Sequence, residues 1–172
     1  EDNHASWSAS WHRTMTQEAE LENIIGHLNV TNLSFADTDE EFTLFERDNQ
    51  AWFRSRRPPD HTPAKVPKRQ EYPIVMLTGS HHQQAYWYPI GATRTLAVVP
   101  VLHLKEADRW VPRKSVFLRP PSTRYESEAG RWNNGCLECH TTGPLPKKSP
   151  NPAHRHIFDT QVAELGISCE AC

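Results

Sequence analysis

Hydrophobic and polar positions predict one helix and several short strands before residue 119. Apolar residues recur at helical spacing over residues 5–27, so we expect a helix there that ends at Gly26. Residues 41–54 predict a β-hairpin instead, because two apolar segments flank a polar turn at 47–50. Three continuous apolar runs predict further strands, at Tyr72–Thr78, Thr95–Leu104 and Ser115–Leu118.

The other segments have little periodicity. Residues 55–70 are basic and contain four prolines, which excludes a regular helix. From Arg119 onwards we expect loops, with one short helix at Asp159–Leu165. The pattern predicts an α+β fold that is largely irregular, with little regular secondary structure and a few short strands. A length of 172 residues suits one domain. We expect residues 1–172 to be a single domain that is truncated at both ends.

The cysteine spacing changes this picture, because it predicts a cofactor. Residues 136–140 read Cys-Leu-Glu-Cys-His, the CxxCH spacing at which c-type haem is attached. The two sulfurs can add to the haem vinyl groups, and the adjacent histidine can ligate the iron. The chain ends on a second CxxC pair, which we interpret as a second attachment motif whose histidine follows the last residue. We therefore expect at least two molecules of haem c, bound through Cys136, Cys139, His140, Cys169 and Cys172.

Four cysteines in two pairs have other uses. A zinc ribbon holds one ion with four thiolates, but its pairs are usually separated by about 15–20 residues. Here 29 residues separate Cys139 from Cys169, and His140 would have no role. Two disulfides and a thioredoxin-like dithiol are further alternatives, and no βαβ pattern surrounds either pair to support the dithiol. We favour haem.

The composition is consistent with a large apolar cofactor. The hydrophobic fraction is 37%, below the usual value of about 45–50%, and a buried macrocycle would supply the missing apolar core. Six tryptophans suit either porphyrin faces or an ordinary core. The net charge is −2 with both signs intermixed, which does not indicate binding to nucleic acid. No apolar run is long enough for a membrane span.

A six-coordinate haem iron needs a second axial ligand, for which His or Met is the usual choice. Histidine is the favoured one here, since the chain has ten His and two Met. His12 lies among tryptophans on the apolar side of the predicted first helix. His81 and His82 follow a predicted strand, where neighbours point oppositely, so one of them should face a given haem. Two more histidines lie in the loop between the cysteine pairs. The candidate iron ligands are therefore His140, His12, His82, His81, His154 and His156, with packing or solvated roles as the alternative for the last five.

Two further expectations concern neighbouring side chains. We prefer His82 over His81, because polar side chains after it can fix its imidazole by hydrogen bonding. These side chains are Gln83, Gln84 and Tyr86. His103, which lies between two leucines, is expected to be a core side chain.

Four stretches of the chain together resemble multihaem cytochrome c proteins of the tetratricopeptide-repeat type and tetrahaem-cytochrome type. They are SWHRTMTQEA (10–19), YPIVMLTGSHHQQAYW (72–87), RWNNGCLECHTTG (131–143) and GISCEAC (166–172). The resemblance implies a haem-wrapped fold with His140 as the proximal ligand, and with His12 and His81 or His82 as distal ligands. It also implies a further CxxCH before the first stretch and a histidine after the last.

These observations predict electron transfer through covalently bound, bis-histidine haems. Covalent attachment of haem predicts a periplasmic or extracellular protein. The expected partners are redox proteins or other cytochromes. Self-association of the chain into a haem filament is a further alternative. An electron carrier is favoured over an enzyme. The alternatives are a haem-based reductase or peroxidase that acts on a small molecule and, less favoured, a four-cysteine zinc protein.

Overall fold

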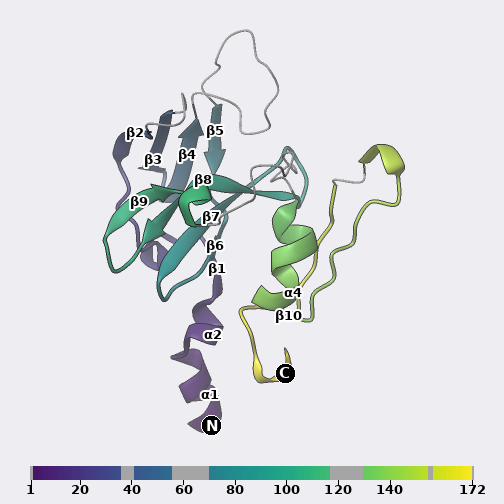
Figure 1. Cartoon of the computed structure of the whole chain (residues 1–172). Helices are drawn as coiled ribbons and strands as arrows, with labels where there is room; N and C mark the ends of the chain where they lie inside the picture. The colour runs from purple at the N-terminus through teal and green to yellow at the C-terminus, as the bar shows by residue number, and fades with distance from the viewer. Residues whose placement is uncertain (1, 36–40, 56–69, 117–129, 155–156, 172) are drawn as a thin grey trace.

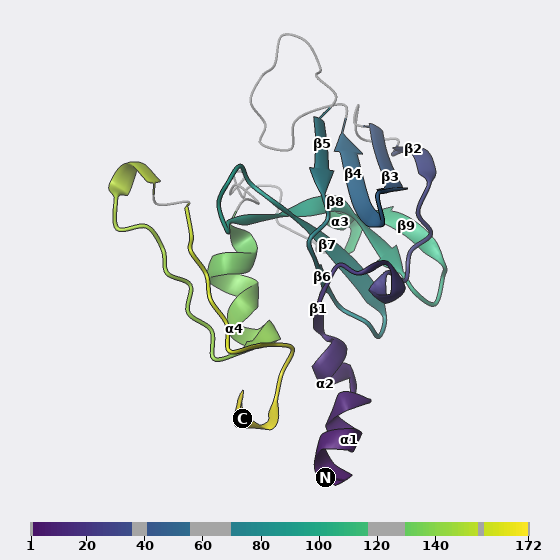
Figure 2. The ribbon, with the colours of Figure 1, turned by 180° about the vertical axis from the view of Figure 1, so that it is seen from behind.

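Two antiparallel β-sheets packed against each other form most of the structure. The computed structural model describes residues 2–35, 41–55, 70–116, 130–154 and 157–171. A helical segment lies beside the sheets, and loops of the C-terminal part run along its far side (Figure 1). The N-terminal helices extend from one end of the sheets, as the view from behind also shows (Figure 2).

The larger sheet has five strands in the order β1-β6-β7-β8-β9, and each strand is antiparallel to its neighbour. Its strands are β1 (Thr16–Glu18), β6 (Met76–Thr78), β7 (Gln83–Pro89), β8 (Leu96–Leu104) and β9 (Arg109–Pro112). The second sheet has the order β2-β3-β4-β5. Its strands are β2 (Val30–Ser34), β3 (Glu41–Arg47), β4 (Gln50–Ser55) and β5 (Gln70–Pro73). We call these two sheets the sandwich.

The remaining elements are short. A two-stranded sheet pairs β10 (Thr141–Thr142) with β11 (Glu164–Leu165). The helices and helical turns are α1 (Asp2–Ser8), α2 (Trp11–Thr14), η1 (Leu21–Asn23), α3 (Arg113–Val116), η2 (Trp132–Cys136), α4 (Leu137–His140), η3 (Pro152–His154) and η4 (Cys169–Ala171). No helix in the described part of the chain is long and apolar enough to cross a membrane.

Strands β7 and β8 are buried on both faces, because side chains alternate across a strand. Tyr86 and Tyr88 of β7 belong to the core between the two sheets, which includes Phe53 of β4. Trp87, between the two tyrosines, belongs to a second apolar cluster with Trp132 of η2. The five-stranded sheet therefore packs against the other sheet on one face and against the helical segment on the opposite face. Burial on both faces explains the continuous apolar runs in these strands.

The predicted hairpin and the longest predicted strand are confirmed. Strands β3 and β4 pair across a turn at Asp48 and Asn49, whose φ angles of 53° and 59° lie in the left-handed region. Such two-residue turns match the twist of paired strands, and Asp and Asn tolerate this conformation. Strand β8 occupies the run Thr95–Leu104 except for its first residue.

The run Tyr72–Thr78 forms two strands in different sheets. Strand β5 ends at Pro73 and β6 begins at Met76. The two residues between them donate their amides to different sheets. Ile74 N–H donates to the carbonyl of Ala51 in β4, and Val75 N–H donates to the carbonyl of Trp87 in β7. The chain changes sheets at this point, which an apolar pattern alone does not indicate.

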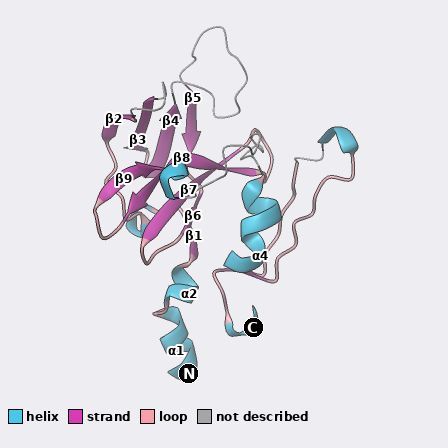
Figure 3. Ribbon diagram, in the orientation of Figure 1, coloured by secondary structure: helices cyan, strands magenta, loops and turns pink. Residues whose placement is uncertain are grey.

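The predicted largely irregular, haem-wrapped α+β fold is wrong. Of the described residues, 41% are extended, in three antiparallel sheets, and 24% are helical (Figure 3). The reason is that the apolar side chains of the chain, aliphatic and aromatic together, form a core between the two sheets. Phe53 stacks on Phe42 at 5.9 Å between ring centroids and lies 5.7 Å from Tyr88. The low hydrophobic fraction therefore did not require a cofactor in this core.

Three local predictions were also wrong. The helix over residues 5–27 gives way at Thr16 to strand β1, which is paired with β6. The predicted strand Ser115–Leu118 overlaps the helical turn α3, and its last two residues lie outside the described part. The predicted helix Asp159–Leu165 contains instead a bridge and strand β11. Most of the proline-rich segment 55–70 lies outside the described residues.

Candidate haem-attachment site

The CxxCH motif lies on a helix, residues 131–140, which we call the cysteine-bearing helix. Its middle part is a wide turn in which Leu137 N–H donates to the carbonyl of Trp132, five residues earlier. Such π turns are rare and often lie at functional sites. The buried side chains of Trp132 and Leu137 pack on the five-stranded sheet. One face of the helix is thereby fixed; Cys136 packs at its edge, whereas Cys139 is exposed.

Asn133 anchors the start of this helix through a fully buried side-chain amide. Its Oδ1 accepts a hydrogen bond from the Leu96 amide at 2.9 Å. Its Nδ2 donates to the carbonyl of Arg94 at 2.9 Å and to Oγ1 of Thr160 at 2.8 Å. A single side chain thus connects the helix, the start of β8 and the C-terminal loop.

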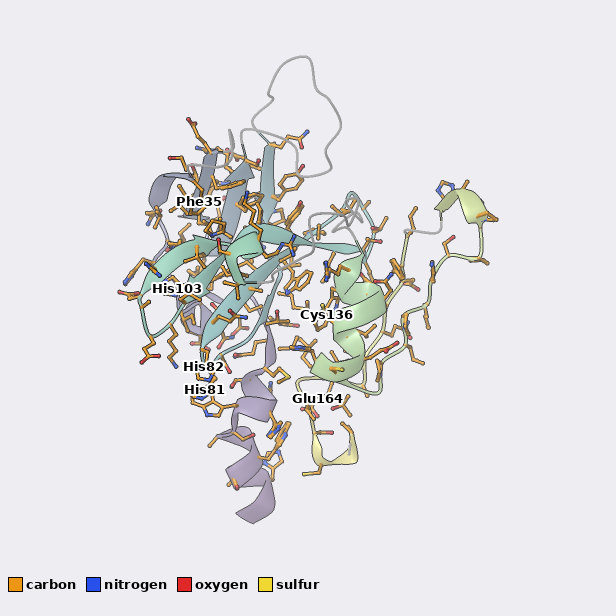
Figure 4. All side chains as sticks on the ribbon, viewed as in Figure 1. Phe35, His81, His82, His103, Cys136 and Glu164 are labelled. Atoms are coloured by element: carbon orange, nitrogen blue, oxygen red, sulfur yellow. The ribbon has the colours of Figure 1, made fainter. Side chains whose placement is uncertain are left out.

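The attachment residues differ in their exposure. Cys136 is half-buried and Cys139 is exposed, and neither forms a disulfide. Positions i, i+3 and i+4 of a helix lie on one face, so His140 shares a face with Cys136. Figure 4 labels Cys136 on this helix. Cys139 is therefore accessible for bond formation, whereas Cys136 also packs against the apolar cluster beneath the helix.

His140 has the properties of a neutral imidazole ligand. Its Nδ1 is buried without a hydrogen-bond partner. The ring lies with its centroid 6.3 Å from that of Trp132, in an edge contact. Burial lowers the pKa of His140, which favours the neutral form that binds metals. The residues at this site therefore fit a haem held by Cys136 and Cys139 with His140 on its iron.

Hydrogen bonds connect the end of the cysteine-bearing helix to other segments. Thr141 Oγ1 donates to the carbonyl of Leu137, and the buried Thr16 Oγ1 donates to the carbonyl of His140, both at 2.7 Å. Thr16 is the second residue after α2, which carries His12. The N-terminal segment and the CxxCH motif are therefore direct neighbours.

The segment before the second cysteine pair joins the same region. Ile167 N–H donates to the carbonyl of His12 at 3.0 Å, and Trp7 Nε1 donates to the carbonyl of Ile167 at 2.7 Å. Gly166 is essential to this contact: its φ is +82°, and a Cβ there would lie 2.4 Å from the carbonyl oxygen of Arg13. Cys169, an exposed free thiol, follows closely. Cys172 lies outside the described residues.

The side chain of His12 does not have the predicted apolar surroundings. It is exposed, and α2 contains no buried residue. An exposed imidazole next to the cysteine-bearing segments is still accessible to a ligand. The prediction of His12 as an iron ligand is therefore untested by the structure, although its reasoning from burial was wrong.

His81 and His82 also lie beside α2 (Figure 4). Gly79 N–H donates to the carbonyl of Met15 at 2.7 Å, and the His81 ring stacks on Trp11 at 4.5 Å between centroids. Both histidines are exposed, and their rings are in contact at 3.9 Å. The expectation that they point oppositely was wrong, because they lie in a bend and not in an extended strand.

Two of the three side chains expected to support His82 lie elsewhere. Gln84 Oε1 accepts a hydrogen bond from the Ile25 amide, and Gln84 Nε2 donates to the carbonyl of Asn23. Tyr86 lies in the sandwich core. The preference for His82 over His81 thus loses most of its basis.

The remaining candidate ligands are not brought to this region. His154 is exposed in η3, at the far end of the C-terminal loops (Figure 1), and His156 lies outside the described residues. Among the residues that the structure describes, no three His, Cys, Asp or Glu side chains form a group that could hold a metal ion. The described cysteines are therefore not arranged as a zinc–thiolate cluster.

Comparison of the chain with protein-family models, curated proteins and solved structures finds no match. The site must therefore be interpreted from its own geometry. That geometry depends on three side chains that the sequence did not single out, namely Trp132, Asn133 and Thr16. The first two directly precede the cysteine motif, whereas Thr16 has no local signal.

Proposed function

We propose that this protein is an electron carrier with c-type haem attached to Cys136 and Cys139. The observation that carries the proposal is the cysteine-bearing helix: the exposed Cys139, the half-buried Cys136 and an imidazole whose pKa is lowered by burial lie within one turn, on a helix whose buried residues pack on a sheet. Haem supplies the one-electron chemistry when bound, and the chain holds and orients it. Since His140 Nδ1 is buried, Nε2 is the nitrogen left to ligate iron.

A second haem on Cys169 and Cys172 is part of this proposal. Its support is the convergence of three of the four stretches that resemble multihaem cytochromes c. The stretch 10–19 contacts both the stretch 131–143, through Thr16 and His140, and the stretch 166–172, through His12 and Ile167. Segments far apart in the chain thus meet beside the first cysteine pair and just before the second, which would bring the two haems close enough for electron exchange.

The proposed surroundings follow from the cofactor. We infer a protein that acts in the periplasm or outside the cell and exchanges electrons with redox proteins or other cytochromes. His12 and His81 or His82 are the proposed distal ligands, because all three lie on or beside α2. Bis-histidine ligation would leave no open iron position and would favour electron transfer over substrate reduction.

The test measures covalent haem in the full chain produced together with haem-attachment enzymes. Intact mass and a pyridine haemochrome assay should give two haems per chain. Cys136→Ser with Cys139→Ser should remove one of them, and Cys169→Ser with Cys172→Ser should remove the other. Haem that is extracted by acid–acetone, or stoichiometric zinc bound by all four cysteines, would refute the proposal.

Axial ligation has a separate test. His12→Ala and His82→Ala, each in the haem-loaded chain, should convert low-spin iron to high-spin iron that binds carbon monoxide. His81→Ala is the matched comparison for His82, because the two rings are in contact. If all three variants keep the low-spin spectrum, the distal ligands come from elsewhere.

A further inference from the structure

Residues 23–28, which we call the strap, cross one end of the five-stranded sheet. Gln84 of β7, a fully buried residue, holds the strap by accepting from Ile25 N–H at 3.0 Å and donating to the carbonyl of Asn23 at 2.8 Å. Gly26 lies directly on the sheet, since a Cβ there would be 2.5 Å from the Trp110 ring. Ile24 and Leu28 pack against the sandwich core. The strap therefore covers this end of the core.

A carboxylate between two imidazoles joins the strap to the turn after β8. His27 Nε2 lies 3.2 Å from Asp108 Oδ2, and His103 Nε2 of β8 lies 3.3 Å from Asp108 Oδ1. Trp110 Nε1 donates to the carbonyl of His27 at 3.3 Å. The strap, β8 and the turn before β9 thus meet at one carboxylate.

His103 is a buried titratable group in this contact. It is 1% exposed, and neither ring nitrogen has a hydrogen bond of good geometry. Burial lowers the pKa of His103, Asp108 partly offsets this by attraction, and His27 adds to the lowering. Two further neighbours of His103 are uncharged: the Trp110 ring lies 5.1 Å away, and Gln84 of β7 is the paired residue. The expected core position of His103 is confirmed, but its polar atoms are poorly satisfied.

We propose that His103, Asp108 and His27 form an acid-sensitive latch that holds the strap closed at neutral pH and releases it when His103 takes up a proton. A buried histidine binds a proton less readily than the same residue in water. The closed latch is therefore fully stable above the ordinary histidine pKa of about 6.5 and loses stability as the pH falls below it. Opening would uncover Tyr86 and the end of the core. The latch uses none of the residues assigned to haem.

The experiment is hydrogen exchange by NMR on the full chain, corrected for the intrinsic effect of pH, between about pH 8 and about pH 5. The Ile25 amide and the Trp110 indole N–H report on the strap, and the Val99 amide reports on the core. We expect protection of the first two to be lost with acid, while Val99 stays protected. If all three groups lose protection at the same pH, the chain unfolds globally and the proposed latch is refuted.

Three variants identify the proton acceptor. His103→Phe keeps an aromatic ring against Trp110 and should abolish the acid-dependent change above the range of carboxylate titration. His27→Gln keeps a donor to Asp108 and should retain the change. Asp108→Asn removes the attraction that favours protonated His103 in the closed state, so opening should shift to higher pH. The inference is refuted if His103→Phe keeps the transition or if Asp108→Asn leaves it in place. If His103→Phe does not fold, the Asp108→Asn variant alone still tests the latch.

Discussion

The sandwich and the cysteine-bearing helix are stabilised by different interactions. In the sandwich, Phe53 is fully buried and packs against the rings of Phe42, Tyr72 and Tyr88 at 5.7–6.3 Å between ring centroids. The helix, in contrast, has the buried Trp132 and Leu137 and a buried amide that makes three hydrogen bonds. Apolar burial is non-directional, whereas hydrogen bonds specify orientation. The sandwich should therefore set the stability of the chain, and polar contacts should set the geometry of the haem site.

The largest predicted effect is that of Phe53→Ala in the sandwich core. Removing a buried phenylalanine side chain costs about 3–5 kcal/mol, so the urea midpoint measured by far-UV circular dichroism should fall strongly. Leu145→Ala is the control, because this side chain is 54% exposed in the C-terminal part and should change stability by no more than about 0.5 kcal/mol. Equal losses in the two variants would contradict the division between sandwich and C-terminal part.

Asn133→Ala should have a smaller but more local effect. The variant leaves the Leu96 amide and the Arg94 carbonyl without their partner, which costs about 1–3 kcal/mol. Exchange of the Leu96 amide should accelerate, and the yield of covalent haem on Cys136 should fall. Asn134→Ala is the matched control, since Asn134 is exposed on the same helix. A comparable loss of haem in the control would show that the buried amide does not position the helix.

The contrast also explains which features could be predicted from the sequence. The hairpin and β8 have strong local signals, a polar turn between apolar segments and a long apolar run. Strand β1 has none, because its extended conformation depends on pairing with β6, about 60 residues away. The same long-range pairing explains why residues 74 and 75 could not be recognised as the point where the chain changes sheets.

In the candidate site, too, features with a local sequence signal could be predicted and features that depend on long-range contacts could not. The CxxCH motif identifies Cys136, Cys139 and His140 through local spacing. The helix that presents them escaped prediction, because its buried residues Trp132 and Leu137 are five apart in a π turn and do not follow helical periodicity. Contacts such as that of Thr16 with the His140 carbonyl join distant segments, and only the folded chain brings them together.

Thr16→Val tests the contact between the N-terminal segment and the attachment motif. The isosteric change removes the hydrogen bond to the His140 carbonyl, with an expected cost of about 0.5–1.5 kcal/mol. Because this bond fixes the residue proposed to ligate iron, the reduction potential of the haem should shift as well. Thr16→Ser keeps the hydroxyl and should restore the potential. If both variants have the same potential, Thr16 contributes to packing alone.

The smallest predicted effect concerns the exposed face of the sandwich, where Glu71 lies between Arg47 and Arg54 at 2.7 and 2.6 Å. Hydrogen bonds from Arg47 and then Arg54 lower the pKa of Glu71 below its usual 4.5. A carboxylate with a lowered pKa stabilises the fold above its ordinary pKa, and this contribution is lost as the pH falls through the lowered value. Because surface ion pairs are screened by water and salt, Glu71→Gln should cost less than about 1 kcal/mol at neutral pH.

The pH and salt dependence of the Glu71→Gln effect distinguishes charge pairing from packing. The difference in unfolding free energy from the parent chain should shrink in acid and in high salt, since both remove the attraction between Glu71 and the two guanidinium groups. Glu106→Gln is the control, an exposed carboxylate in the turn before β9. A loss at Glu71 that persists unchanged in high salt would mean that the carboxylate acts by ordering Arg47 over the Trp52 ring, 3.8 Å from its centroid. In that case the outer face of the sandwich would depend on stacked aromatic contacts, as its core does.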